Sequence, residues 1–171
     1  MKAKKYFKTI LILTLLLFIG GCATTTSILS PVQKRHITTK IIEGSYENVY
    51  RATLTVLQDH GYIIKNTDMA SGLIVANADR KTSGVLQFMQ ALFIGYVPDK
   101  GSEIEITCMV NKLSDQTSEL RMNIREVKYG QSSVWSSSGK QDVKQIYDEK
   151  IYQALFNEIT VEVKRREALN R

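Results

Sequence analysis

The strongest constraint on the fold is a stretch in which apolar and polar residues alternate between positions 103 and 125. Every second residue is apolar from position 104 to 110 and again from 120 to 124, on either side of a turn expected around 114–117. These residues are Ile104, Ile106, Cys108, Val110, Leu120, Met122 and Ile124. Side chains two positions apart share one face of a β-strand. The stretch therefore predicts an antiparallel hairpin with one buried face and one solvent-facing face.

Charged residues occupy the polar face of this hairpin. Its first strand carries Glu103 and Glu105. We expect them to lie across from Arg121 and Arg125 of the second strand, in pairs that stabilise the sheet modestly. Such a row is typical of a solvated face, and we prefer this interpretation to a substrate-binding surface. Cys108 lies on the apolar side and is expected to be a buried thiol, with an exposed reactive thiol as the alternative.

Two segments carry apolar residues at helical spacing. The first follows the N-cap residue Ser45 and ends before Gly61. Its buried side is expected to contain Tyr46, Tyr50, Leu54 and Leu57. The second helix is expected to begin at Asp142, which opens a capping-box-like pattern, and to continue through Ile159. A strand, a turn and a second strand are expected between the first helix and the hairpin, at residues 62–78.

These elements predict a single α+β domain. We expect an antiparallel sheet of about four to five strands with two main helices packed on one face. A further short strand is expected at residues 38–42. The domain is expected to span residues 43–171, and residues 22–42 are expected to form a flexible tether in front of it. This length is enough for one domain with a proper core and too short for two.

The first 21 residues differ from the rest in composition. They contain four lysines and no acidic residue, and positions 10–19 are almost all apolar. This apolar segment is too short to cross a hydrocarbon core of ~30 Å as a helix. A positive segment followed by a short apolar one predicts a signal peptide over residues 1–21.

The four residues Ile19-Gly20-Gly21-Cys22 resemble the lipobox of bacterial lipoproteins. In that family, signal peptidase II cuts before the cysteine, whose sulfur carries a diacylglycerol and whose new amino terminus receives an acyl chain such as palmitate. The resemblance implies that Cys22 is lipidated and that the peptidase recognises the three residues before it. Cleavage by the ordinary signal peptidase and an uncleaved membrane anchor are the alternatives. Ala23 is not an aspartate, which by resemblance favours the outer membrane, with the protein facing the periplasm.

Most of the positive charge belongs to the predicted signal peptide. The full chain has 23 basic and 17 acidic residues and a formal net charge of +6. Without the four N-terminal lysines, 19 basic and 17 acidic residues remain, and the net charge falls to +2. The sequence therefore gives little reason to expect a nucleic-acid partner.

The sequence contains no arrangement of residues typical of an enzyme or a metal site. His36 and His60 belong to no recognisable set of metal ligands. The string from Ser137 to Lys140 matches a nucleophile motif by its letters alone, without the companion motifs. We therefore expect a non-enzymatic protein with no cofactor apart from the lipid on Cys22.

Two further stretches are candidates for contact with a partner. Residues 85–98 are apolar, and they either pack across the core or form an exposed patch that meets a partner or the bilayer. Trp135 lies in a stretch rich in glycine and serine, where it either covers the end of the core or anchors a partner. The candidate contact residues are Leu86, Phe88, Met89, Leu92, Phe93 and Trp135.

The domain also resembles small helix-grip lipoprotein domains such as those of BamC, a lipoprotein of outer-membrane assembly. The resemblance rests on the run from Val49 to Ala76 and on the apolar positions of the last helix. It implies a helix-grip-like fold and an accessory role beside another cell-envelope protein. The alternative function is a carrier or sensor of a small apolar or lipid-like ligand held between sheet and helix.

Overall fold

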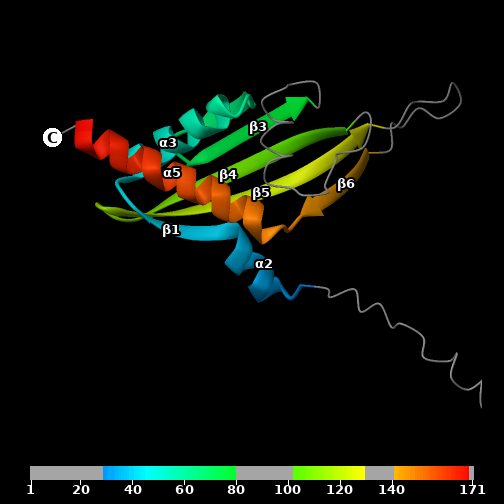
Figure 1. The fold of residues 1–171 in the computed structure, drawn as a ribbon, viewed down its shortest axis with the longest axis horizontal. Helices are drawn as coiled ribbons and strands as arrows, with labels where there is room; N and C mark the ends of the chain where they lie inside the picture. The colour runs from blue at the N-terminus through cyan, green and yellow to red at the C-terminus, as the bar shows by residue number, and fades with distance from the viewer. Residues whose placement is uncertain (1–28, 80–101, 130–140, 170–171) are drawn as a thin grey trace, which may run out of the picture.

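The computed structural model describes residues 29–79, 102–129 and 141–169. The elements are α2 (Pro31–Thr38), β1 (Thr39–Glu43), α3 (Tyr46–Asp59), β2 (Ile63–Asp68), β3 (Leu73–Asp79), β4 (Ser102–Ser114), β5 (Thr117–Tyr129), β6 (Gln141–Ile146) and α5 (Glu149–Leu169). Six antiparallel strands form one sheet, and α3 and α5 cover one of its faces (Figure 1). The predicted α+β class is confirmed, with six described strands where four to five were expected. Among the described residues, no helix is both long and apolar enough to cross a membrane.

The hairpin of β4 and β5 is the centre of the sheet, as its alternation predicts. Ile106 lies opposite Ile124 and Cys108 opposite Met122, all on the face toward the helices. The strand order is β1-β5-β4-β3-β2, and β6 also pairs with β5. Because β4 and β5 have 13 residues each, they are longer than their neighbours and can pair with several short strands.

The core lies between the sheet and the two long helices. Its largest fully buried side chains are Tyr152, Phe156, Ile42, Leu57, Ile74, Ile106, Leu120, Met122, Ile124, Ile151 and Leu155. Each aliphatic or aromatic side chain of this kind contributes roughly 1.5–3 kcal/mol through its removal from water. The predicted burial of Cys108 is confirmed, since its side chain is inaccessible to solvent.

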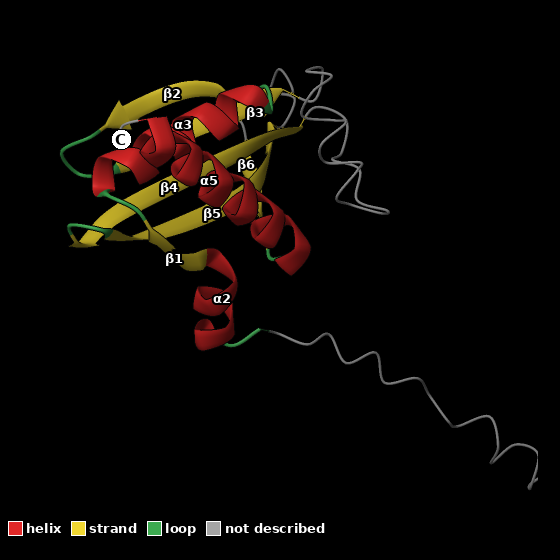
Figure 2. Ribbon diagram, turned by 60° about the vertical axis from the view of Figure 1, so that its left-hand side comes forward, coloured by secondary structure: helices red, strands yellow, loops and turns green. Residues whose placement is uncertain are grey.

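Helix α3 begins where the sequence predicts. The Ser45 hydroxyl oxygen accepts a hydrogen bond of 3.3 Å from the backbone N–H of Asn48, which caps the helix. Of the side chains expected on the buried side, Tyr50 and Leu57 are buried, while Tyr46 and Leu54 are partly buried against the core. Helix α3 lies beside α5, and α2 lies near the edge strand β1 (Figure 2).

The second half of the predicted tether belongs to the fold. Residues 31–38 form α2 and residues 39–43 form β1, which pairs with β5. Ile42 is only 1% exposed and belongs to the core. The domain therefore begins well before residue 43, because this segment supplies an edge strand. The short strand expected at 38–42 is confirmed with a shift of one residue.

The predicted helix start at Asp142 is wrong. Residues 141–146 form β6, in which Val143 is 48% exposed and Ile146 only 6%. The physical reason is that the backbone N–H and C=O groups of the C-terminal half of β5 are satisfied by pairing with a strand on the side away from β4. Residues 141–146 form that strand. Helix α5 begins at Glu149, where the Asp148 carboxylate accepts a hydrogen bond of 2.9 Å from the Lys150 N–H.

One of the two expected cross-strand charge pairs is present. Arg125 donates a hydrogen bond of 2.8 Å from its Nε to Glu105, directly opposite in the register. Glu103 instead lies opposite Val127 and accepts a 3.0 Å hydrogen bond from the side-chain amide of Asn77. Arg121 lies opposite Met109, so the expected pairing of Arg121 with a glutamate of β4 is wrong.

Candidate functional site

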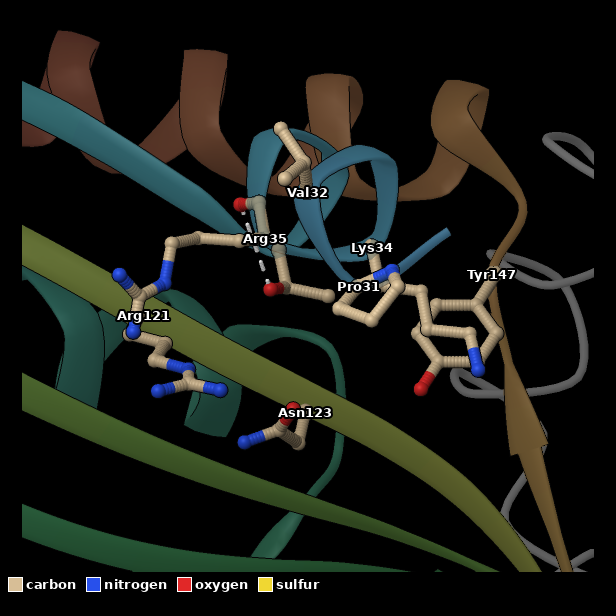
Figure 3. A pocket seen from close by; sticks show the side chains of 8 residues that line it. Pro31, Val32, Lys34, Arg35, Arg121, Asn123 and Tyr147 are labelled. Atoms are coloured by element: carbon tan, nitrogen blue, oxygen red, sulfur yellow. Dashed lines mark hydrogen bonds between the residues drawn. The ribbon is translucent and has the colours of Figure 1, made fainter. Parts of the chain in front are cut away.

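A pocket of about 530 Å³ lies where α2, β5 and the short segment between β6 and α5 meet. Its lining residues are Pro31, Val32, Lys34, Arg35, Thr38, Arg121, Asn123 and Tyr147 (Figure 3). We call it the basic pocket. Its volume is within the ~300–1,000 Å³ range of small-molecule sites.

The pocket lies at a break along one edge of β5. Strand β1 pairs with this edge as far as Arg121, and β6 pairs with it from Ile124 onward. Asn123 is therefore on a part of β5 that pairs with neither strand. Helix α2 enters the sheet here through Thr38, and the chain leaves β6 here through Tyr147. Residues distant in sequence therefore meet around one gap.

Tyr152 of α5 completes the hydrogen bonding at this break. Its hydroxyl accepts a 3.1 Å hydrogen bond from the Ile124 N–H and donates one of 3.0 Å to the Ile146 carbonyl. The side chain is fully buried, and burial raises the pKa of its hydroxyl to about 12. The phenol thus remains neutral at ordinary pH and holds the end of β6, which positions the following Tyr147.

Helix α2 positions the basic side chains of the pocket. A capping box holds its first turn, because the Ser30 hydroxyl accepts from the Gln33 N–H at 3.3 Å and the Gln33 side chain accepts from the Ser30 N–H at 2.8 Å. Pro31 occupies the first turn, where its missing N–H costs nothing. The ammonium of Lys34 lies 5.1 Å from the centre of the Tyr147 ring, a cation–π contact across the pocket.

The electrostatics of the pocket are one-sided. Among the described residues, Lys34, Arg35 and Arg121 line it, and no aspartate or glutamate does. Within the described part of the chain, the guanidinium groups of Arg35 and Arg121 form no ion pair and no hydrogen bond. The other described arginines, namely Arg51, Arg125, Arg165 and Arg166, each form an ion pair with a glutamate. The two arginines of the pocket are therefore available to a ligand.

The residues that the sequence singled out for lipidation and partner contact lie outside the described residues. These are Ile19, Gly20, Gly21, Cys22, Leu86, Phe88, Met89, Leu92, Phe93 and Trp135. His60 is described, and its Nε2 lies 2.6 Å from the Glu158 carboxylate. In the described ranges, no group of three or more His, Cys, Asp or Glu side chains is arranged to hold a metal ion.

The basic pocket itself was not predicted from the sequence. A local signal for α2 was present in Ser30-Pro31-Val32-Gln33, which combines an N-cap serine, a first-turn proline and a third-position glutamine. The meeting of Arg35 with Arg121 has no local signal, because it depends on which strand β1 joins. Comparison with protein-family models and with curated proteins finds no match to this chain.

Proposed function

We propose that the protein is a bacterial lipoprotein whose domain acts as a non-enzymatic binding module at a membrane of the cell envelope. The observation that carries this proposal is the run Ile19-Gly20-Gly21-Cys22 directly after a short apolar segment with a lysine-rich start. A diacylglycerol and an N-linked acyl chain on Cys22 would together give stable anchoring, whereas a single chain binds only marginally. By resemblance, Ala23 favours the outer membrane and the periplasm.

The short distance along the chain between Cys22 and the domain supports a role near the membrane. Only residues 23–30 separate the cysteine from α2. A fully extended chain spans at most about 3.6 Å per residue, so these residues reach no more than roughly 30 Å. An anchor at Cys22 would therefore keep α2 and the basic pocket close to the lipid headgroups.

The partner we propose is another protein of the cell envelope, met by the candidate surfaces at residues 85–98 and at Trp135. The apolar side chains between the sheet and helices α3 and α5 are buried against one another in one cluster. This supports binding of a partner on the surface of the domain more than binding of a ligand inside its core. The alternative function, a carrier or sensor of a small apolar or lipid-like ligand, stays a prediction. Native mass spectrometry of the purified protein would detect a small molecule that remains bound to it.

The anchor is tested by replacing Cys22. Cells grown with an alkyne-tagged palmitate analogue are expected to label the wild-type protein, because its N-terminal cysteine accepts acyl chains. Cys22→Ser is expected to abolish the label and to block the cut by signal peptidase II, which leaves a longer precursor. The label is measured by in-gel fluorescence after a click reaction.

Cys108→Ser is the matched control, since it removes the other cysteine of the chain. It should keep the label because the Cys108 thiol is buried. A wild-type protein without label, or a Cys22→Ser variant that keeps it, would overturn the proposed anchoring.

A further inference from the structure

We propose that the basic pocket is a binding site for a phosphate group carried by a small organic molecule or a lipid headgroup. The site is made by Arg35 of α2 and Arg121 of β5, with Lys34, Asn123 and Tyr147 around them. Figure 3 shows the guanidinium groups of the two arginines extending toward the same side of the pocket. Two adjacent positive groups that have no acidic partner among the described residues favour an anion between them.

The nearest acid along β5 is Glu119, which lines a neighbouring hollow together with Arg35 but forms no ion pair with Arg35 or Arg121. Glu119 precedes Arg121 by two positions and so shares its face of the strand, but it is absent from the lining of the basic pocket. Its carboxylate accepts a 3.2 Å hydrogen bond from the side-chain amide of Asn111 on β4. The positive charge of the pocket therefore remains for a ligand to neutralise.

The number of donors favours phosphate over carboxylate. Each guanidinium presents a rigid fork of N–H groups, and the pocket adds an ammonium and the side-chain amide of Asn123. A carboxylate has two oxygens in one plane, which a single fork already engages. A phosphate monoester has three terminal oxygens and a phosphodiester two, and because they lie on a tetrahedral phosphorus, both arginines can donate to them from different directions.

The size of the pocket indicates that the phosphate is attached to an organic group. A volume of about 530 Å³ is much larger than a phosphate ion needs. Pro31, Val32 and the ring of Tyr147 provide apolar surface beside the basic side chains. A sugar, a glycerol unit or the start of an acyl chain would contact this surface while the phosphate meets the arginines.

Two classes of ligand carry a phosphate attached to an organic group. A soluble phosphate monoester carries up to two charges, and the headgroup of an anionic phospholipid is a phosphodiester with one. The lipid source rests on the proposed anchoring, which would hold the pocket within reach of the headgroups. The phosphate site itself rests only on the geometry of α2 and β5 and does not depend on Cys22.

The test is a calorimetric titration of the full chain in nonionic detergent. One arm uses glycerol 3-phosphate, a soluble phosphate monoester, and the other uses glycerophosphoglycerol, the deacylated headgroup of phosphatidylglycerol. We expect saturable binding of one ligand per chain in at least one arm. Arg35→Gln and Arg121→Gln should each weaken it by about tenfold or more, because each removes charge-assisted hydrogen bonds.

Two further variants separate a built site from general attraction of anions. Arg51→Gln removes the same charge from α3, where Arg51 forms an ion pair with Glu47, and should leave the binding unchanged. Arg121→Lys keeps the charge but loses the fork, and should bind more weakly than the wild type. Circular dichroism checks that each variant folds.

The arms also identify the source. Tighter binding of the diester assigns the site to lipid headgroups, and tighter binding of glycerol 3-phosphate assigns it to a soluble phosphate monoester. No saturable binding in either arm, or an equal loss in Arg51→Gln, overturns the proposal. Absence of palmitate labelling in the wild-type protein would refute the anchor and leave these titrations unaffected.

Discussion

A single hydroxyl group, that of Tyr152, joins three elements of the fold. It accepts from the Ile124 N–H of β5 and donates to the Ile146 carbonyl of β6, while its ring packs in the core from α5. The β5 edge is unpaired just beyond this point, so no neighbouring strand supplies these hydrogen bonds. The hydroxyl therefore replaces a missing part of the ladder.

Removing this hydroxyl should destabilise the protein. Tyr152→Phe keeps the ring but leaves a buried N–H and a buried carbonyl with one partner fewer, at a cost of about 1–3 kcal/mol in the free energy of unfolding. Urea denaturation followed by circular dichroism measures this loss. Tyr46→Phe, which removes a hydroxyl bonded to the Met69 carbonyl at an exposed site, should cost less. Equal losses in both variants would contradict the role given to Tyr152.

The buried thiol of Cys108 should make the folded protein sensitive to high pH. Burial raises its pKa from 9.0 to about 12. Since the folded pKa is the higher one, this stabilising contribution is complete below pH 9 and is lost as the pH rises toward 12. Unfolding by urea at several pH values from 7 to 11 should show a smaller decline above pH 9 in Cys108→Ala than in the wild type.

The same burial predicts the reactivity of the thiol. A thiol-specific reagent at pH 8 should not modify Cys108 in the folded protein and should modify it in urea. Cys22→Ser is the suitable background, because it leaves Cys108 as the chain's only cysteine. Fast labelling without urea would show that the thiol is accessible and would remove the basis for the pH effect.

At the level of elements, the short helix α2 links the N-terminal part of the chain to the sheet. It has only eight residues, so its capping box contributes much of what holds it in place. Its last turn carries Arg35 and leads directly into β1. The geometry of the basic pocket therefore depends on the first turn of α2, although Ser30 does not line the pocket.

Breaking this cap should loosen α2. Ser30→Ala removes the hydroxyl that accepts from the Gln33 N–H and should cost about 1 kcal/mol of helix stability. Hydrogen–deuterium exchange should become faster in residues 34–38 and stay unchanged in α3. Ser45→Ala is the matched control, because it removes the corresponding cap of α3 and should speed exchange there instead. Unchanged exchange in α2 would show that packing alone holds it.

For the whole molecule, the sheet has two different faces. The apolar face is covered by α3 and α5, and the other face carries the Glu105–Arg125 pair and its polar neighbours. The basic pocket lies at the edge where β1 and β6 meet β5, near the start of the described chain. If Cys22 is lipidated, this arrangement brings the pocket and the membrane together.

The features that depend on neighbouring residues were predictable from the amino-acid sequence. The alternation around Cys108 defines the β4–β5 hairpin and its buried face, and Ser45 marks the start of α3, because periodicity and capping are local. The lipobox-like run ending at Cys22 is likewise a pattern of adjacent residues.

The pairing of segments that are distant in the sequence was not predictable from local patterns and follows from the three-dimensional packing. The pattern at residues 141–146 suits a helix start, but the segment forms a strand that pairs with β5. This pairing satisfies backbone groups that would otherwise lack hydrogen bonds. Residues 39–43 pair with the same edge of β5, and this pairing places Arg35 beside Arg121. The basic pocket exists because two short strands share one long edge and leave a gap, which no local pattern encodes.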